Sequence, residues 1–281
     1  MIVITFMFKN LLTNKINVKF FKDTNCYVFE IENFLSQDQY DSIYENLPNI
    51  KINEFKEFNK DFDNKDSQHQ FKAFIAEGFT DKYNKFIYEN IILNEFVKTM
   101  KSPKMVKMLM KKFFWRILIS RIFDPKNFLK LLLRKNRSVE KKSDKLLDKF
   151  LYNEIISNVS LTYSCKESQL FPHTDGMKKI LSLMLYFPDK NITDSVRKNL
   201  GTTFWNSNEF ALTQDDLKNK ISNLEDAENF KKKNKISMTL PFKDKSMFGF
   251  IKSHKSWHSV EPSKLDNNFI RKNLIINLFL V

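Results

Sequence analysis

Hydrophobic and polar residues alternate in short stretches of the C-terminal half of the chain, and a period of two predicts β-strands. Residues 159–163 read Val-Ser-Leu-Thr-Tyr, as in a strand with one buried face. Residues 180–187 form a nearly unbroken apolar run that Pro188 stops, which suits a buried strand better than a helix. Three more strands are expected at 201–205, 246–251 and 274–281. Short strands in series predict a mainly β fold with some α, built on a double-stranded β-helix (a jelly roll, cupin-like).

The N-terminal half carries helical signals beside one clear strand at 27–31. Ser36-Gln37-Asp38-Gln39 is a capping-box pattern that should start a helix running to residue 46 or 47, where Pro48 ends it. Residues 80–100 have apolar positions at helical spacing and predict one long helix. We expect these helices to back one face of the jelly roll.

Three other segments have weaker patterns. Residues 1–8 are apolar but lack a preceding basic region and a cleavage site, so an opening strand is expected rather than a signal peptide. Residues 53–70 are charged and patternless, and residues 214–235 mix both charge signs. The first is expected to be a loop, and the second a surface insertion between two core strands that borders the mouth of an active site.

The composition supports one large domain. Of the 281 residues, 42% are apolar and 29 are phenylalanine, enough to build a substantial core. We divide the domain 1–281 into N-terminal support (1–100), a basic helical insertion (101–150) and a catalytic jelly-roll core (151–281). Cys26 and Cys165 are the two cysteines, which is no disulfide framework and favours a reducing, cytoplasmic setting.

Positive charge is concentrated in residues 101–149, which hold 16 Lys or Arg against four acidic residues and contribute +12 of the net +14. Apolar residues are interleaved with these bases, as in a pair of amphipathic helices. A merely solvated lysine face is the simplest interpretation. An anionic membrane or lipid-linked substrate is an alternative, and nucleic acid, which responds mainly to positive charge, ranks last.

The sequence His173-Thr174-Asp175, followed later by His258, carries the strongest chemical signal. Residues i and i+2 of a strand point to the same face, so His173 and Asp175 can reach one metal ion. Two imidazoles and one carboxylate are the ligand set of non-haem Fe(II) oxygenases. The third ligand is His258 or His254, because strand parity does not separate them. His69 lies in a polar stretch and is expected at the surface.

The segment from His258 through Pro262 to Arg271 sharpens this interpretation. With His173 and Asp175 it resembles the Fe(II)/2-oxoglutarate-dependent oxygenases, in their prolyl-4-hydroxylase-like branch, over roughly residues 150–281. The resemblance favours His258 over His254 and leaves His254 as a neighbouring polar residue. It implies that Arg271 holds the far carboxylate of 2-oxoglutarate, a role that suits its planar, permanently charged fork.

Two further residues enter through the same resemblance. Tyr163, ten residues before His173, resembles a tyrosine that often contacts the co-substrate. Asn273 stands where a serine or threonine often follows the arginine by two, which leaves one hydrogen bond to the co-substrate in question. Gly201-Thr202-Thr203-Phe204 resembles the Gly-rich start of a core strand, although only one glycine is present.

The resemblance implies a dioxygenase that binds Fe(II) through His173, Asp175 and His258 and uses 2-oxoglutarate, O2 and an unidentified organic substrate. It would hydroxylate a C–H bond and release succinate and CO2, with ascorbate as a possible auxiliary reductant. Asp175 argues against halogenation, because related halogenases lack this carboxylate. The alternative function is a non-catalytic basic protein that binds an anionic membrane or nucleic acid through residues 101–149.

Overall fold

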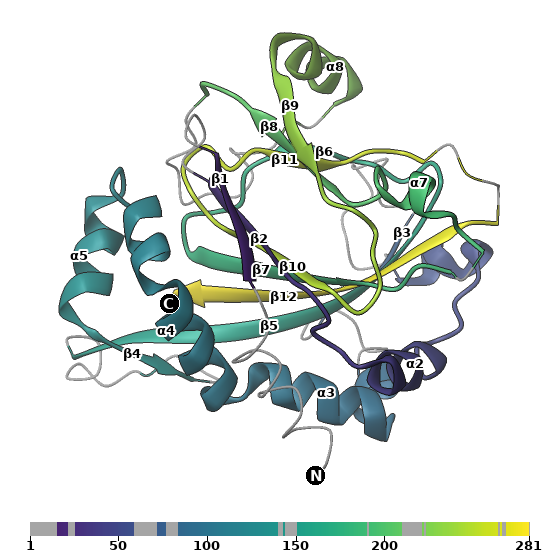
Figure 1. Ribbon diagram of the computed structural model, residues 1–281, viewed down its shortest axis with the longest axis horizontal. Coiled ribbons are helices and arrows are strands. Elements are labelled where there is room, and N and C mark those ends of the chain that lie inside the picture. The colour runs from purple at the N-terminus through teal and green to yellow at the C-terminus, as the bar shows by residue number, and fades with distance from the viewer. Residues whose placement is uncertain are drawn as a thin grey trace.

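Two β-sheets face each other in the computed structural model (Figure 1), which describes residues 16–21, 26–58, 72–76, 84–139, 143, 151–189, 191–209, 221, 223–263, 265 and 268–280. The smaller sheet has the order β6 (Leu170–His173), β11 (His258–Val260), β8 (Thr202–Asn206), β9 (Lys235–Thr239). The larger sheet has the order β1 (Ile16–Phe21), β2 (Cys26–Ile31), β10 (Met247–Ile251), β7 (Lys179–Tyr186), β12 (Ile270–Leu280), β5 (Tyr152–Cys165), β3 (Lys72–Ala76). Neighbours in both orders are antiparallel. The predicted mainly β jelly roll is confirmed.

Helices cover the face of the larger sheet that is turned away from the smaller one (Figure 1). These helices are α2 (Gln37–Glu45), α3 (Ile91–Lys101) and α4 (Pro103–Ser120), and α5 (Pro125–Leu133) packs against α4. The short helix α7 (Asp194–Arg197) contributes to the cluster between the sheets, and α8 (Leu224–Lys233) lies beside the smaller sheet (Figure 1). The chain also forms a 3-10 turn, η2 (Ile52–Phe58), and a π-helical turn, η4 (Asn84–Tyr88). The main hydrophobic cluster joins α2, α3 and α4 to the larger sheet.

Strand alternation divides the interior into two layers. On β7, Leu181, Leu183 and Leu185 belong to the cluster under the helices, whereas Met184 and Tyr186 belong to the cluster between the two sheets. Because both faces of β7 are buried, its sequence is apolar almost throughout instead of alternating. The space between the sheets is therefore lined by every second residue of each core strand.

The helical predictions were right for α2 and wrong for the longer helix. Ser36 caps α2 with a complete capping box, in which Gln39 reaches back to the Ser36 amide. The single helix expected at 80–100 is instead η4 followed by α3. The break falls at Asn90, whose side chain accepts a hydrogen bond from the Leu93 amide (3.0 Å) and so starts a new helix.

Residues 1–8 and most of 53–70 lie outside the described residues. The described part of the second segment, residues 53–58, makes up most of η2 and is not the expected loop. Within 214–235, the described part forms α8. The basic segment forms α4 and α5 and then a short strand, β4 (Lys135–Ser138), which pairs in parallel with the start of β5. Among the described residues, no helix is both long enough and apolar enough to cross a bilayer.

Candidate active site

Two neighbouring strands of the smaller sheet bring the two histidines together. His173 ends β6, His258 begins β11, and the two residues are direct partners in the antiparallel pairing. Their ring centroids lie 4.3 Å apart. Asp175 follows His173 by two residues, and its Oδ2 lies 3.7 Å from Nε2 of His258. The potential ligand atoms of the three side chains all lie within 4.8 Å of one another, which is the spacing that a single metal ion requires.

Backbone carbonyls fix how both imidazoles are turned. Nδ1 of His173 lies 2.8 Å from the Phe171 carbonyl oxygen, and Nδ1 of His258 lies 2.9 Å from that of Ser256. A carbonyl oxygen can only accept, so each Nδ1 carries the proton and each Nε2 keeps its lone pair. Burial lowers the pKa of His258, which favours the neutral ring that a metal needs. Carbonyl contacts of this kind are the usual support of metal-binding histidines.

The two oxygens of Asp175 have different surroundings. Oδ1 accepts a hydrogen bond from Nζ of Lys179 at 2.7 Å, whereas Oδ2 is buried and has no hydrogen-bond partner. Burial by itself would raise the pKa of this carboxyl, but Lys179 and the two imidazoles hold it well below its usual range. A buried carboxylate oxygen without a partner needs an explanation, and a cation shared with His173 and His258 supplies one.

This donor set fits ferrous iron. Two imidazole nitrogens and one carboxylate oxygen on one side of an octahedral ion leave its remaining positions open for other ligands. The three side chains approach from one strand end, one loop and one strand start of a single sheet. The other side of the group is not occupied by a fourth His, Cys, Asp or Glu among the described residues.

The buried Arg121 supports the loop that carries Asp175, and a second buried basic residue, Lys252, interacts electrostatically with Asp175. Arg121, at the end of α4, donates to the Met177 carbonyl (Nη1 to O, 2.8 Å) and to the Lys179 carbonyl. Lys252, just after β10, is fully buried and donates to the Ser253 carbonyl. Burial lowers the pKa of Lys252 to about 7 and that of Arg121 to about 10. Arg121 therefore stays charged at neutral pH, whereas Lys252 is partly neutral there.

His254 lies outside the group of three. It is buried, and its ring contacts the ring of Phe123 edge-on, with the centroids 4.5 Å apart. Burial lowers the pKa of His254 to about 4. Its place beside α4 makes it a packing residue next to the candidate site. His69 lies outside the described residues.

Arg271 offers a binding site for an anion in the space between the sheets. It lies on β12, is buried, and shares a strand face with Asn273 and Ile275; Ile275 packs in the cluster between the sheets. Nη2 donates to the Glu261 carbonyl (3.2 Å), while Nε and Nη1 have no partner. Burial lowers the pKa of Arg271 to about 10, so the guanidinium is still charged at neutral pH. Two unpartnered donors of one buried arginine fit a carboxylate.

Tyr163 does not share this space, and its predicted contact with a co-substrate is not supported. Its ring belongs to the cluster under the helices, and its hydroxyl donates to the Pro48 carbonyl (2.7 Å). It therefore faces away from Arg271. Thr162 lies on the opposite face of β5 from Tyr163 and is paired with Asn273 in the strand register. Its buried hydroxyl has no hydrogen-bond partner.

Two residues near the site, Lys179 and Tyr186, were missed in the sequence. Lys179 pairs with Asp175, and its position four residues further along the chain gave only a weak signal. Tyr186 lies beside Asn273 in the strand pairing and contributes to the electrostatic environment of Arg271. The Tyr186 hydroxyl lies 3.1 Å from Oγ1 of Thr202. A tyrosine inside an apolar run reads simply as core in the sequence.

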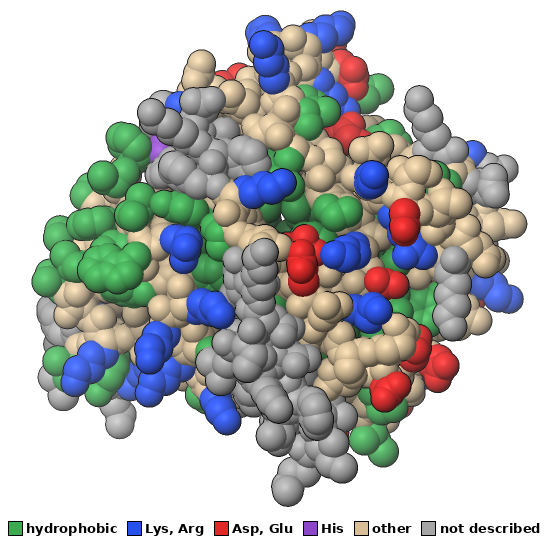
Figure 2. All heavy atoms as spheres, in the orientation of Figure 1, with side chains coloured by type: hydrophobic (Ala, Val, Ile, Leu, Met, Phe, Trp, Pro, Cys, Tyr) green, Lys and Arg blue, Asp and Glu red, His purple; other side chains and the backbone are tan. Residues whose placement is uncertain are grey.

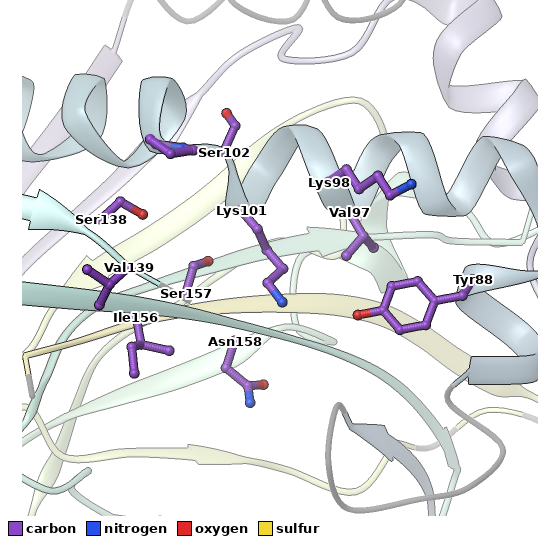
Figure 3. A pocket seen from close by; sticks show the side chains of 11 residues that line it. Tyr88, Val97, Lys98, Lys101, Ser102, Ser138, Val139, Ile156, Ser157 and Asn158 are labelled. Atoms are coloured by element: carbon purple, nitrogen blue, oxygen red, sulfur yellow. The ribbon is translucent and has the colours of Figure 1, made fainter. Parts of the chain in front are cut away.

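A separate cavity of about 710 Å³ lies on the helix side of β5 and contains none of the three grouped residues (Figure 3). It is bounded by α3, the start of α4 and the middle of β5, and the side chain of Lys101 reaches down toward Asn158.

No protein-family model matches the chain, and no curated protein matches it. Several solved structures are similar. A prolyl-4-hydroxylase from Pseudomonas putida is 8% identical with a TM-score of 0.39, over 100% of both chains. A prolyl hydroxylase from Trichoplax adhaerens, in complex with a hypoxia inducible factor peptide fragment, is 11% identical with a TM-score of 0.39, over 98% of this chain and 88% of that one. HygX from Streptomyces hygroscopicus, with nickel and 2-oxoglutarate bound, is 9% identical with a TM-score of 0.37, over 93% and 85%. At such identities the likeness concerns the fold alone.

Proposed function

We propose that this protein is an Fe(II)- and 2-oxoglutarate-dependent dioxygenase that hydroxylates a C–H bond of an organic substrate. One observation carries the proposal. His173, Asp175 and His258 converge in a buried site, with both Nε2 lone pairs and the unpartnered Oδ2 available to one ion. This is the ligand set of non-haem Fe(II) oxygenases.

The three residues would hold the iron and keep part of its coordination sphere open. When bound, Fe(II) and 2-oxoglutarate supply the oxidising chemistry, in which O2 is consumed, succinate and CO2 are released and one oxygen atom enters the substrate. The carbonyls of Phe171 and Ser256 keep the two imidazoles in the ligating tautomer. Lys179 holds the second oxygen of Asp175 and so aims the first.

Arg271 would bind the distal carboxylate of 2-oxoglutarate. Its unpartnered Nε and Nη1 can each donate a hydrogen bond to an anion, and the surrounding apolar cluster excludes water that would weaken these bonds. Asn273 and Thr162 lie on the same side of the larger sheet and are candidates for further polar contacts with the co-substrate. We propose these roles in place of the one first expected for Tyr163.

The finer features of the proposal rest on the sequence. The order of His258, Pro262 and Arg271 favours the prolyl-4-hydroxylase-like branch. Cys26 and Cys165 are buried and form no disulfide, in keeping with a reducing, cytoplasmic setting that would also keep iron ferrous. Ascorbate would serve as an auxiliary reductant in turnover.

The test is succinate release from 2-oxoglutarate by the purified protein supplied with Fe(II), ascorbate and O2, without added substrate. We expect slow uncoupled turnover that requires both Fe(II) and 2-oxoglutarate. His173→Ala and His258→Ala should abolish it. His254→Ala is the matched control, because it removes a nearby buried imidazole that is not part of the metal group.

Two results would reject this function. One is succinate release that is equal in the wild type and in His173→Ala, which would mean that the activity does not come from this site. The other is no succinate release from wild-type protein that has been shown to carry one Fe(II) and to bind 2-oxoglutarate.

A further inference from the structure

The outer surface of α4 and α5 exposes many large apolar side chains (Figure 2, the green area at the left). Twelve large hydrophobic residues are exposed among the described residues, and seven of them lie between positions 115 and 133. These seven define the apolar patch: Trp115, Ile119, Ile122, Phe123, Leu129, Leu132 and Leu133. A cluster of this kind on one surface generally marks an interaction site.

The fold does not require these side chains. The buried side of α4 is supplied by other residues, among them Met105, Leu109, Phe113 and Ile117. Trp115 and Ile119 lie on the opposite side of the same helix and are 68% and 46% exposed. A helix that is apolar on its outer as well as its inner side has a second apolar contact to make.

Positive charge surrounds the apolar patch. Lys104, Lys107 and Lys111 lie at helical spacing on α4 and continue the outward stripe that Trp115 and Ile119 complete. Residues 101–139 contain 12 Lys or Arg, and the one acidic residue, Asp124, is used as the N-cap of α5. A groove of about 900 Å³ between α4, α5 and β4 repeats the pattern, with Val106, Met110 and Leu131 inside and Lys111, Arg134 and Lys135 among its lining.

We infer that the α4–α5 surface docks on an anionic lipid bilayer, with the apolar patch inserted at the level of the headgroups. Apolar side chains that include Trp and Phe, bordered by Lys and Arg, are the composition of helices that lie in a membrane interface. A second copy of the chain would have to bring two strongly positive surfaces together. Nucleic acid would use the bases but leave the exposed Leu and Ile without a role.

The docking surface is joined to the candidate active site. The turn between α4 and α5 carries Ile122 and Phe123 of the apolar patch, and Arg121 in the same turn binds the carbonyls of Met177 and Lys179, just after Asp175. Phe123 also contacts His254. Docking would therefore bring the loop of the metal site close to the lipid surface. The inference does not depend on the proposed oxygenase activity.

The test is flotation of the full-length protein with vesicles of phosphatidylcholine, alone or with about 30% phosphatidylserine. We expect binding to the anionic vesicles that weakens at about 0.5 M salt, because the ions screen the basic residues. Trp115 provides a second readout: Trp205 and Trp257 are buried, so a blue shift of the tryptophan emission on lipid binding reports on Trp115.

Matched variants separate the surface from general effects. Leu133→Ser should weaken partitioning by about tenfold, whereas Ile91→Ser should leave it unchanged, although both residues are 76% exposed. Lys111→Glu combined with Lys135→Glu should weaken it by more than about tenfold, and Lys232→Glu combined with Lys233→Glu on α8 should have a much smaller effect. Thermal unfolding of each variant checks that the fold is kept.

Three outcomes would overturn the inference. The first is the absence of binding to anionic vesicles at low salt. The second is binding that Leu133→Ser and Ile91→Ser leave equally strong. The third is a dimer in sedimentation velocity that Trp115→Ser dissolves and vesicles do not compete with, because the apolar patch would then be covered by a second copy.

Discussion

The ammonium group of Lys179 lies 2.7 Å from Oδ1 of Asp175, so the carboxylate that completes the candidate metal group is already paired with a cation on one oxygen. Its other oxygen faces His258. A metal ion at this group would therefore bind the oxygen of Asp175 that the ion pair does not use. The ion pair with Lys179 can therefore hold Asp175 in place in the metal-free protein.

Lys179→Met should destabilise the metal-free protein by about 3 kcal/mol, because it leaves a buried carboxylate without its cation. This loss in the free energy of unfolding should be smaller when Fe(II) is bound under anaerobic conditions, since the metal supplies the missing positive charge. Urea unfolding with and without metal measures both values. Because Asp175 has a lowered pKa, its contribution is present above about pH 4 and is lost as the pH falls further, so the two proteins should converge in acid.

The neighbouring Lys178 is exposed, and Lys178→Met is the control for this experiment. It should change the free energy of unfolding by less than about 0.5 kcal/mol. A Lys179→Met protein that is as stable as Lys178→Met without metal would show that the ion pair does not support Asp175.

Arg271→Lys should raise the dissociation constant for 2-oxoglutarate by about 10- to 100-fold, because an ammonium cannot replace a planar fork that donates two hydrogen bonds. Fe(II) binding should not change. Isothermal titration of the anaerobic iron protein with 2-oxoglutarate provides the measurement. Lys272→Met is the control on the other face of β12, where Lys272 pairs with Asp189; equal losses in both variants would contradict the assignment of Arg271.

Lys252→Met should raise the free energy of unfolding at pH 7, by on the order of 2 kcal/mol, because a charge no longer has to be buried. The folded-state pKa of about 7 lies below the unfolded value of 10.5. Lys252 therefore lowers the free energy of unfolding most at and below neutral pH. The increase in the free energy of unfolding that Lys252→Met causes should diminish as the pH rises toward 10.5. Chemical unfolding at pH 7 and pH 10 tests this; a destabilised variant at pH 7 would mean that Lys252 makes a net favourable contribution.

The pH dependence of stability should contain a term from His254. Its pKa is about 4 in the folded protein and 6.5 in the unfolded chain, so between these values only the unfolded state gains the proton. Stability should fall as the pH is lowered through this window, and His254→Gln should flatten the slope by up to about 1.4 kcal/mol per pH unit. Identical slopes in the wild type and the variant would show that His254 is protonated in the folded state.

Local patterns in the sequence were enough to predict much of the fold. The strands at 180–187 and 246–251 are β7 and β10, displaced by one residue, because each is a short apolar run with turn residues beside it. His173 and Asp175 come together as predicted, although β6 ends at His173 and Asp175 lies in the loop after it, so the shared strand face is not the reason. The capping box at Ser36 defined the start of α2.

Features that depend on which face of a sheet a residue occupies were harder to predict. Tyr163 has the parity of Val159 and Leu161, and all three face the helices. The other face of β5 carries small polar residues, among them Thr162, and lies on the same side of the sheet as Arg271 and Asn273. The role of Lys179 depends on the fold of the loop after Asp175, and that fold depends on Arg121, more than 50 residues earlier.

Anaerobic titration of the metal-free protein with Fe(II) tests most directly whether the three side chains form one metal site. The geometry predicts one bound ion per chain in the wild type and in His254→Ala, and a loss of binding in His173→Ala and in His258→Ala. Binding of Fe(II) to His173→Ala with unchanged stoichiometry and affinity would contradict the metal site, and with it the proposed oxygenase.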